Sequence, residues 1–336
     1  MGIVSRVVVT GAAGNLGRRI VAAAREAGLE VTAMVRGRVP PDWEGDPGVA
    51  VVVRDLASGD LAEVFAGASA VIHAAAGQGD DAAHARDTIE STRAVVAATP
   101  PGTRLVLVSS FSVYAVAGMP DGATLDETSP TEPDAAARDA YARAKLGQER
   151  IAVAAAQTGG CDLWILRPGA IFGPGRTWTA RLGWKKGGQV VCPGGDARVP
   201  AIHADHAAAA LVAAATAPDL GWPDDLPVLE GQGRIRVINL VDPDPPTQRE
   251  WLEAIGHARM MALPRRAMMR VAGLLDLGAG VSPRFGRLLP GSLGEAVLAA
   301  RFKPLRYSTA RAEDRLGHRP GRDFATAMRA SREGKA

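Results

Sequence analysis

A glycine-rich loop near the N-terminus constrains the fold more than any other part of the sequence. Residues 10–17 read TGAAGNLG, the apolar run 7–9 precedes them, and a helical pattern covers 16–27. Glycines between a strand and a helix allow the backbone to approach a pyrophosphate, whose charge the N–H groups at the helix start stabilise. With the apolar run 31–35 as the next strand, the pattern predicts a βαβ unit. The residues predicted to bind the phosphates are Gly11, Ala13, Gly14, Asn15, Leu16 and Gly17.

Further apolar runs at 49–53, 70–72, 105–108 and 163–166 alternate with helical patterns at 80–98 and 135–157. Continuous apolar strands are typical of a parallel sheet covered by helices on both faces. We therefore predict an α/β protein with a Rossmann-type, doubly wound parallel sheet and a smaller, interleaved C-terminal lobe. Residues 1–168 would form the dinucleotide-binding domain. Residues 169–336 would mainly bind substrate, while segments at about 200–217 and 235–242 return to the Rossmann core.

Three polar residues predict the chemistry: Ser110 follows the run 105–108, and Tyr141 precedes Lys145 by one helical turn. Reducing a ketone, or oxidising an alcohol, needs a proton donor or acceptor at the oxygen while hydride moves at carbon. We expect Lys145 to lower the pKa of Tyr141, and Ser110 to donate a second hydrogen bond to the substrate oxygen. The alternative is an exposed Tyr and Lys on an amphipathic helix, and the glycine loop and serines upstream favour catalysis.

The end of the run 31–35 bears on the choice of cofactor. No Asp or Glu stands there to bind a ribose 2′-hydroxyl, whereas Arg36, with Arg38 as a second candidate, could pair with a 2′-phosphate. The sequence therefore favours NADP(H) over NAD(H). The other residues expected along the cofactor are Asp55 and Leu56 near the adenine and the small residues Ala74, Ala75 and Ala76. For His73, structural and functional roles both remain open.

Taken together, these motifs resemble the extended short-chain dehydrogenase/reductase family, which includes nucleotide-sugar epimerases, 3β-hydroxysteroid dehydrogenases and dihydroflavonol reductases. The resemblance covers nearly the whole chain, through VSSFSVY at 108–114, YARAKLGQE at 141–149, LRPGAIFGPG at 166–175, IHADH at 202–206 and a closing segment at 307–320. It implies Ser110, Tyr141 and Lys145 as catalytic residues and a homodimer. It also implies cofactor contacts from Tyr141, Lys145 and Pro168, and substrate contacts from Ser112, Ala170, Ile171 and Phe172.

Departures from the family pattern narrow the reaction. Phe111 and Ser112 stand where the dehydratases carry an Asp-Glu pair, which argues against dehydration, and Thr88 replaces a usual structural asparagine. The strand before Arg36 resembles that of NADP-using, dihydroflavonol-reductase-like members. We predict NADP(H)-dependent hydride transfer to or from a carbonyl or hydroxyl of a mainly apolar small molecule. An NAD-dependent nucleotide-sugar epimerase is the alternative, and a non-catalytic cofactor-binding protein is the least favoured.

Composition excludes several other classes. With 47% hydrophobic and 22% charged residues the chain is expected to be globular, and no signal peptide precedes the first strand, so we expect a cytoplasmic protein. The alanine-rich run 207–217 is shorter than the roughly 20 apolar residues of a membrane span. Aromatic residues make up only 4%, which argues against nucleic acid as a partner. Cys161 and Cys192 are expected to be core residues, and a metal site is not expected, since His203, Asp205 and His206 lack a fourth ligand.

The last part of the chain is basic, with 16 Lys and Arg against 6 Asp and Glu from Arg259 onward. Solvated helix faces are the favoured explanation, and an anionic partner is the alternative. An apolar, Met-rich stretch at 260–277 is interspersed with arginines. Core packing is its default interpretation; a lid over an apolar substrate, or contact with a membrane surface, is the sharper hypothesis.

Overall fold

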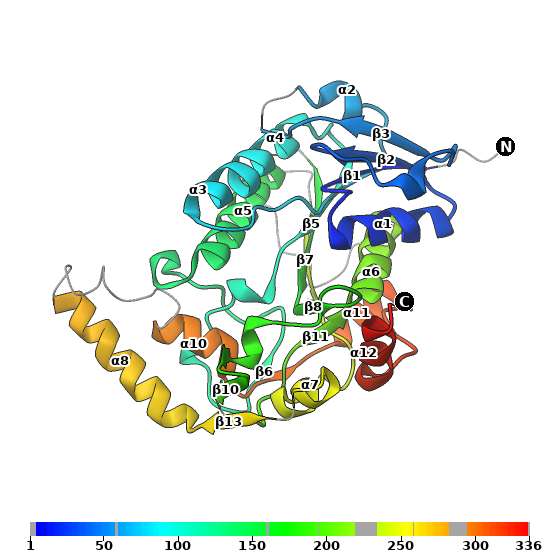
Figure 1. Ribbon diagram of the computed structural model, residues 1–336. Coiled ribbons are helices and arrows are strands. Elements are labelled where there is room, and N and C mark those ends of the chain that lie inside the picture. Colours follow the sequence, from blue (N-terminus) through cyan, green and yellow to red (C-terminus); the bar gives the residue numbers. More distant parts are fainter. Residues whose placement is uncertain are drawn as a thin grey trace.

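The computed structural model describes residues 5–57, 60–158, 161–193, 195–218, 234–257, 259–281 and 294–334. Within these residues, seven strands form one parallel sheet in the order β12–β7–β5–β4–β1–β2–β3 (Figure 1). This order is that of a Rossmann-type fold, as the sequence predicts. The strands are β1 (Arg6–Thr10), β2 (Glu30–Val35), β3 (Val49–Val53), β4 (Ala70–His73), β5 (Arg104–Val108), β7 (Asp162–Pro168) and β12 (Ile235–Leu240).

The direction in which strands are added reverses between β1 and β4. From β1 the chain continues to β2 and β3 on one side, and then crosses to β4, β5 and β7 on the other. Ligands of open α/β sheets bind at such a switch point, beyond the carboxyl ends of the strands. Thr10 and His73 are register partners at the ends of β1 and β4, so the two segments that follow them start side by side.

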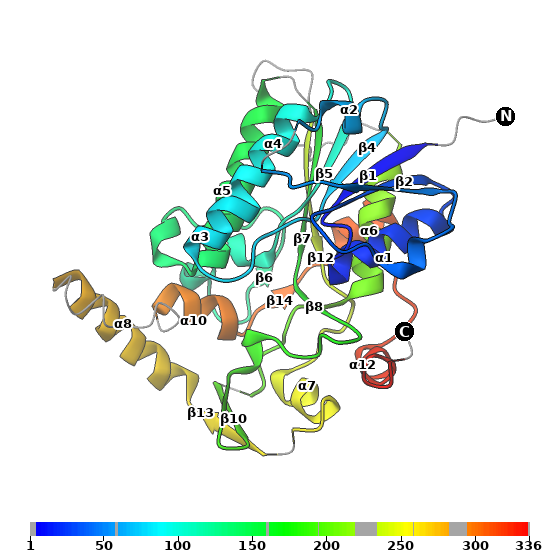
Figure 2. The same ribbon diagram turned by 45° about the horizontal axis from the view of Figure 1, so that its top comes forward.

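Alternating side chains of the strands bury two separate hydrophobic cores. Val7 and Val9 of β1 pack in the core on one face, whereas Val8 packs in the core on the other. Figures 1 and 2 show α1 (Asn15–Glu26) and α6 (Ala204–Thr216) on one side of the sheet. On the opposite side lie α3 (Asp81–His84), α4 (Ser91–Ala98) and α5 (Ala140–Gln157). Both faces are covered, which explains why the strands are apolar throughout.

Helices α2 (Ala62–Phe65) and α11 (Ala310–Leu316) pack into the cores that flank the sheet, and α2 lies at the top of Figure 1. The other strands and α-helices form the lower part of the molecule, or lower lobe. Strands β8 (Ala170–Phe172) and β11 (Ala201–His203) pair in parallel, and β10 pairs with β9 and β13. The strands are β6 (Thr124–Leu125), β9 (Trp184–Lys186), β10 (Gln189–Pro193), β13 (Met260–Leu263) and β14 (Arg306–Tyr307). The helices are α7 (Gln248–Ala254), α8 (Arg265–Val281), α10 (Glu295–Phe302) and α12 (Phe324–Arg332).

Two helical segments differ in detail from the sequence prediction. The segment 80–98 is α3, a π-helical segment η2 (Ala85–Glu90) and α4, and not one regular helix. The segment 135–157 holds a short 3₁₀ turn, and α5 begins only at Ala140, where the Asp139 carboxylate accepts the N–H of Ala142 at 3.0 Å. That cap places Tyr141 in the first turn of α5.

The Met-rich stretch also divides between two environments. Met268 and Met269 of α8 pack against the core residues Leu298 and Phe302 of α10. Leu274 and Leu277, by contrast, are each 69% exposed. Core packing therefore explains only one face of α8. Cys161 and Cys192 are free and buried, which confirms that both are core residues. Among the described residues, no helix is long and apolar enough to cross a membrane.

A buried ion pair joins α5 to β7. Arg167 donates two hydrogen bonds to Glu149, at 2.8 and 2.7 Å, and their side chains are 7% and 8% exposed. The hydroxyl of Ser109 also donates to Glu149, and the Arg167 guanidinium lies 4.7 Å from the centre of the Tyr114 ring. The network therefore fixes the end of β5 against α5.

Replacing Glu149 by Ala should lower the free energy of unfolding by about 3–5 kcal/mol, because it leaves the buried Arg167 charge without its partner. Chemical denaturation followed by circular dichroism measures the change. Glu26→Ala, on an exposed face of α1, is the control and should change stability by no more than about 0.5 kcal/mol. Equal stabilities of the two variants would show that the pair does not support the fold.

Candidate active site

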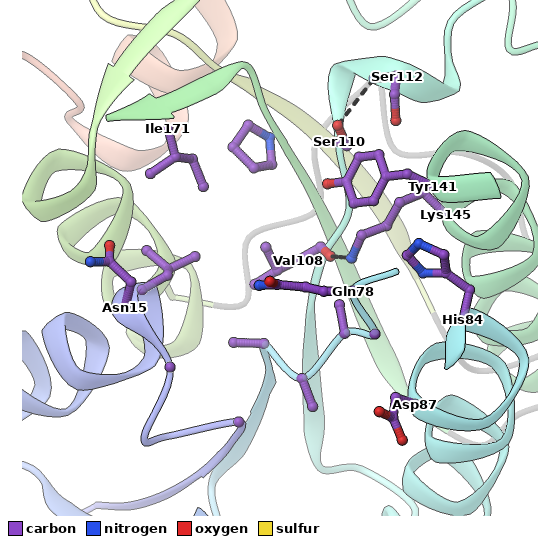
Figure 3. Close-up of a pocket in the computed structure, with 18 of the residues that line it drawn as sticks. Asn15, Gln78, His84, Asp87, Val108, Ser110, Ser112, Tyr141, Lys145 and Ile171 are labelled. Atoms are coloured by element: carbon purple, nitrogen blue, oxygen red, sulfur yellow. Dashed lines mark hydrogen bonds between the residues drawn. The ribbon is translucent and has the colours of Figure 1, made fainter. Parts of the chain in front are cut away.

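A cavity of about 1040 Å³ opens beyond the carboxyl ends of β1, β4, β5 and β7. Its lining begins at the glycine loop and continues past Ser110 and Tyr141 to residues of the lower lobe, among them Trp178 and Ala300. Figure 3 shows the central part, with Asn15 on one side and Tyr141 and Lys145 on the other. The cavity therefore joins a phosphate-binding loop to a set of titratable side chains.

The glycine loop has no room for side chains at two of its positions. A Cβ on Gly11 would lie 2.7 Å from the backbone of Ala75, and a Cβ on Gly17 would lie 2.1 Å from the carbonyl oxygen of Gly11. Gly11 also has a φ of 69°, which favours glycine. No side chain caps the first N–H groups of α1 at Gly14. These N–H groups and the close backbone approach fit the pyrophosphate of a dinucleotide.

The cavity wall around Arg36, where an adenosine is expected to bind, carries a charge cluster that the sequence did not predict. Arg36 donates to Asp87 of η2 at 2.9 Å, and Arg86 donates to the same carboxylate at 2.7 Å. Burial opposes ionisation of Asp87, but the hydrogen bonds from Arg86 and Arg36 outweigh it and lower the pKa of Asp87. Arg36 is thus already paired with a carboxylate. The exposed Arg38 does not line the cavity.

Ser110, and not Ser109, faces Tyr141. Ser109 donates to Glu149 in the network beneath the site, whereas the Ser110 hydroxyl oxygen accepts the N–H of Ser112 at 3.1 Å. Because that N–H occupies a lone pair, the Ser110 proton remains available for donation. The Ser110 hydroxyl lies beside the Tyr141 hydroxyl and favours its ionised form, and Figure 3 shows Tyr141 between Ser110 and Lys145.

Tyr141 does not have the lowered pKa that we expected. As a whole the residue is 41% exposed, since its ring forms part of the cavity wall. Its hydroxyl, however, lies deep enough that burial raises its pKa, against the opposing effects of Ser110 and of the charges on Arg176 and Arg181. The net pKa is thus raised and not lowered as predicted, because burial outweighs the charges that favour the phenolate. Tyr141 is a protonated acid at neutral pH.

Lys145 is 3% exposed and has two neutral acceptors. Its ammonium donates to the carbonyl of Val108 at 2.7 Å and to the side-chain oxygen of Gln148 at 2.8 Å. Burial lowers the pKa of Lys145 to about 8, although the nearby charge of Glu149 opposes the shift. The lysine is still mainly protonated at pH 7, and it is easier to deprotonate than a surface lysine.

The far end of the cavity is rich in arginine. Four guanidinium groups line it, from Arg138, Arg176, Arg181 and Arg301. Glu132 pairs with Arg138 at 3.5 Å and Asp139 pairs with Arg301 at 3.0 Å, whereas no ion pair within the described residues involves Arg176 or Arg181. Burial, together with the like charges of Arg138 and Arg301, lowers the pKa of Arg181. This end of the cavity therefore carries an excess of positive charge.

The structure brings nearly all the predicted site residues to this one cavity. The predicted residues in its lining are Gly11, Ala13, Gly14, Asn15, Leu16, Gly17, Arg36, Asp55, Leu56, Ala74, Ala75, Ala76, Ser110, Ser112, Tyr141, Lys145, Pro168, Ala170 and Ile171. Phe172 is the exception and has to be withdrawn as a substrate contact. It is 1% exposed and packs with Trp251 and Phe324 in the core of the lower lobe, because its side chain points away from the cavity.

Sequence reasoning missed several residues of the lining. Asp87 and His84 lie in helical segments without a motif, and His84 places its ring edge against Tyr141, with 6.1 Å between ring centres. Arg176 and Arg181 follow the matched segment 166–175 but belong to no motif. Thr88, which replaces the usual asparagine, nevertheless supports the loop, since its hydroxyl accepts the N–H of Gly77 at 2.8 Å. His73 lies outside the lining and hydrogen-bonds to Thr10 and Thr92.

The residues once considered for a metal site have other partners. His203 contacts the Ser331 hydroxyl at 3.2 Å, and His206 contacts the carboxylate of Asp242 at 3.0 Å. Across the described part of the chain, no group of three or more His, Cys, Asp or Glu could hold a metal ion.

Fold and site together define an NAD(P)-dependent enzyme of the short-chain dehydrogenase/reductase type. The family model described as "NAD dependent epimerase/dehydratase family" matches residues 7–227, and the chain belongs to this family. A protein of Caulobacter vibrioides named "Ceramide reductase" is 31% identical over 287 residues, which cover 81% of this chain and 76% of that protein. A Synechocystis sp. protein named "Putative dihydroflavonol 4-reductase" is 34% identical over 174 residues, and this match spans 49% of each chain, about half of that relative's length.

Solved structures share the fold at low sequence identity. MoeE5, in complex with UDP-glucuronic acid and NAD, superposes with a TM-score of 0.67 at 21% identity, over 96% of both chains. The UDP-glucuronic acid 4-epimerase from Bacillus cereus, in complex with UDP-glucuronic acid and NAD, has a TM-score of 0.67 at 16% identity, over 98% of both chains. These likenesses establish the architecture that the sequence predicts.

Replacing Gly17 by Ala should weaken dinucleotide binding, because the new Cβ would overlap the carbonyl oxygen of Gly11. Overpacking of this kind costs about 1–3 kcal/mol, which corresponds to roughly a 5- to 150-fold loss of affinity for the dinucleotide. Titration of NADH and NADPH by fluorescence measures it. Gly14→Ala is the matched control, since its Cβ would lie 3.2 Å from the same oxygen, and it should bind better than Gly17→Ala. Identical affinities for both variants would rule out this packing argument.

Proposed function

We propose that the protein transfers a hydride between a nicotinamide cofactor and a carbonyl or hydroxyl group of a small molecule that carries an anionic group. One observation supports this most strongly: the cavity that begins at the glycine loop reaches the neighbouring side chains of Ser110 and Tyr141, with the Lys145 ammonium beside them. A hydride donor next to a proton donor is what carbonyl reduction needs. The similarity to the Caulobacter reductase supports net oxidoreduction.

The cofactor would lie between the glycine loop and Lys145 and would supply the hydride to the carbonyl carbon, or accept it in the reverse direction. Tyr141 donates its hydroxyl proton to the carbonyl oxygen, and its raised pKa keeps that proton in place until the transfer. Ser110 donates a second hydrogen bond to the same oxygen. Lys145 keeps a positive charge one helical turn from Tyr141, which stabilises the phenolate that remains after proton transfer. Oxidation of an alcohol reverses each proton movement.

The arginine-rich end of the cavity supports an anionic substrate. Arg176 and Arg181 lack a carboxylate partner within the described residues, and both charges act on the Tyr141 hydroxyl. Arg176 is exposed and Arg181 is half-buried with one N–H on the carbonyl of Ala300, so an anionic group of the substrate would supply the negatively charged partner that both guanidinium groups lack. Ile171, Val297 and Ala300 supply apolar surface beside the arginines. We therefore propose a substrate with an anionic group, such as a carboxylate or phosphate, and an apolar part, in place of a mainly apolar one.

Tyr141→Phe should reduce kcat by about 10²- to 10⁴-fold, since it removes the proton donor. Its affinity for the cofactor, measured by fluorescence titration, should stay within twofold of wild type. The substrate comes from a screen of carbonyl compounds with and without a carboxylate or phosphate, with NADPH and NADH run in parallel. Phe111→Leu is a control for the packing of neighbouring apolar side chains. Full turnover by Tyr141→Phe would refute the assignment.

For the cofactor we propose NADP(H). The lining at the adenosine end includes Arg36 and Arg54, and guanidinium groups match the geometry of a 2′-phosphate. Asp87 opposes this choice, because its carboxylate holds Arg36 at 2.9 Å. A 2′-phosphate would have to take the place of Asp87 beside Arg36. The balance between these two charges should set the preference between the cofactors.

Arg36→Gln should weaken NADPH binding by about ten- to hundredfold, which is the usual effect of losing a hydrogen bond to a charged group, and should leave NADH binding unchanged. Asp87→Asn should strengthen NADPH binding, because Arg36 loses its competing partner. Arg38→Gln, outside the cavity, controls for net charge. Dissociation constants for both cofactors provide the comparison. A wild-type preference for NADH, or an equal loss for both cofactors in Arg36→Gln, would contradict the proposal.

Epimerisation of a nucleotide sugar with NAD is the second candidate. The excess of arginine beside Tyr141 favours it, because the diphosphate of such a substrate is an anionic group of the required kind. The fold is shared with the UDP-glucuronic acid 4-epimerase from Bacillus cereus. Epimerisation predicts that NAD copurifies with the protein and that the absorbance of free cofactor stays constant while the substrate changes. Net reduction predicts a stoichiometric loss of absorbance at 340 nm, the nicotinamide band.

A further inference from the structure

We propose that Gln148 is a positioning residue: its side-chain amide fixes the Lys145 ammonium, and a buried hydrogen-bonded chain through Thr92 and His73 to Thr10 fixes that amide. The inference rests on the proposed function in so far as it gives Lys145 a role in hydride transfer. The chain itself lies outside the cavity lining, apart from Lys145. Thr10, His73, Thr92 and Gln148 are all 0% exposed.

At the Lys145 end of this hydrogen-bonded chain, one N–H of the ammonium has no acceptor among the described residues. An ammonium has three N–H donors, and Lys145 uses one on the carbonyl of Val108 and one on Gln148. No carboxylate hydrogen-bonds to it within the described residues, since Glu149 acts only through its charge. The third N–H remains for the cavity, which Lys145 lines. Figure 3 shows the ammonium turned toward Val108 at the edge of the cavity.

Thr92 determines which way the Gln148 amide faces. The Thr92 hydroxyl donates its single proton to the carbonyl of Thr88 at 2.6 Å, so it can only accept from its other neighbours. The Gln148 side-chain nitrogen lies 3.0 Å from that hydroxyl and donates to it. The amide oxygen therefore points to Lys145. A flipped amide would place its NH₂ group against the ammonium and leave two donors facing one another.

His73 completes the chain as a neutral side chain. Its Nε2 lies 3.0 Å from the Thr92 hydroxyl and must donate to it, which leaves Nδ1 to accept from the Thr10 hydroxyl at 2.7 Å. Burial and the charge of Lys145 lower the pKa of His73 to about 3, so the ring is neutral at neutral pH and this arrangement holds there. Thr10 ends β1, directly before the glycine loop. The chain thus connects the catalytic lysine to the strand that carries the cofactor loop.

The hydrogen bond from Lys145 to Gln148 should affect the protonation of Lys145 as well as its position. The carbonyl dipole of Gln148 favours the ammonium, so its removal should make Lys145 easier to deprotonate. A carboxylate at the same place should make it harder. If Gln148 only filled space, the variants Gln148→Met and Gln148→Glu would not shift the titration of Lys145 in opposite directions.

The test measures the titration of Lys145 directly, by ¹³C NMR of protein with ¹³Cε-labelled lysine and without cofactor. Gln148→Met should shift the titration to lower pH, and Gln148→Glu should shift it to higher pH. Lys145→Arg identifies the signal. In parallel, kcat for Gln148→Met should fall by about ten- to hundredfold, the usual range for a lost hydrogen bond to a charge, with KM changed by less than threefold.

The Thr92 variants test how the amide is oriented. Thr92→Val should reproduce the direction of the Gln148→Met shift, because nothing then holds the amide nitrogen, while Thr92→Ser keeps the hydroxyl and should restore the wild-type titration. Thr99→Val is the matched control. It removes a buried hydroxyl that donates to Val95 at 2.7 Å at the end of the same helix, remote from Lys145.

The proposal would be overturned if Lys145 titrated alike in wild type, Gln148→Met and Gln148→Glu, or if Thr92→Ser behaved as Thr92→Val. Should a Gln148 variant fail to fold, the Thr92 pair still decides the question. Because the NMR titration needs no turnover, its failure is distinguishable from a failure of the proposed reaction, which would appear as inactivity of the wild type toward every carbonyl substrate.

Discussion

Burial of one ammonium group, that of Lys145, is the constraint on which the candidate active site depends. A lysine that is 3% exposed stays protonated at neutral pH only if acceptors surround it, and the sheet and α5 each supply one. Val108 supplies its carbonyl because β5 ends at that residue. Gln148 reaches the ammonium because it lies one turn further along the same helix. The acceptors are neutral, so the lysine remains charged without being neutralised by a carboxylate.

The ion pair beneath the site keeps the two supporting elements in register. Glu149 follows Gln148 on α5 and turns to the other side, where it binds Arg167 of β7 and Ser109 at the end of β5. Ser110, the next residue, consequently faces the cavity and Tyr141. Ser109 and Glu149 thus hold the elements together. Their neighbours serve the site: Ser110 faces the cavity, and Gln148 binds the Lys145 ammonium.

The sequence predicted the fold and the centre of the site because both depend on local patterns. Apolar runs of about five residues between helical patterns indicate a parallel sheet, and the ends of its strands meet at one edge, so the glycine loop, Ser110 and Tyr141 had to converge. The raised pKa of Tyr141 could not be predicted, because it depends on how deeply its hydroxyl is buried. Likewise, Asp87 meets Arg36 across 51 residues of sequence.

The other differences between the sequence prediction and the structure concern residues that belong to no periodic sequence pattern. Arg181 and Arg301 come from separate elements of the lower lobe, and only the tertiary structure brings their like charges together. Phe172 belongs to a three-residue strand whose Ala170 and Ile171 line the cavity, whereas its own ring packs against Trp251. In so short a strand the sequence does not indicate where the lining ends and the core begins.

Transfer of deuterium from the cofactor tests the central claim most directly. The protein is incubated with reduced nicotinamide cofactor that carries deuterium at both C4 positions and with the carbonyl substrate identified by screening, and the product is analysed by mass spectrometry and NMR. Hydride transfer predicts one deuterium on the carbinol carbon, together with an equal amount of oxidised cofactor. A product without deuterium, or an isomerised substrate with the free cofactor unchanged, would contradict net reduction by this site.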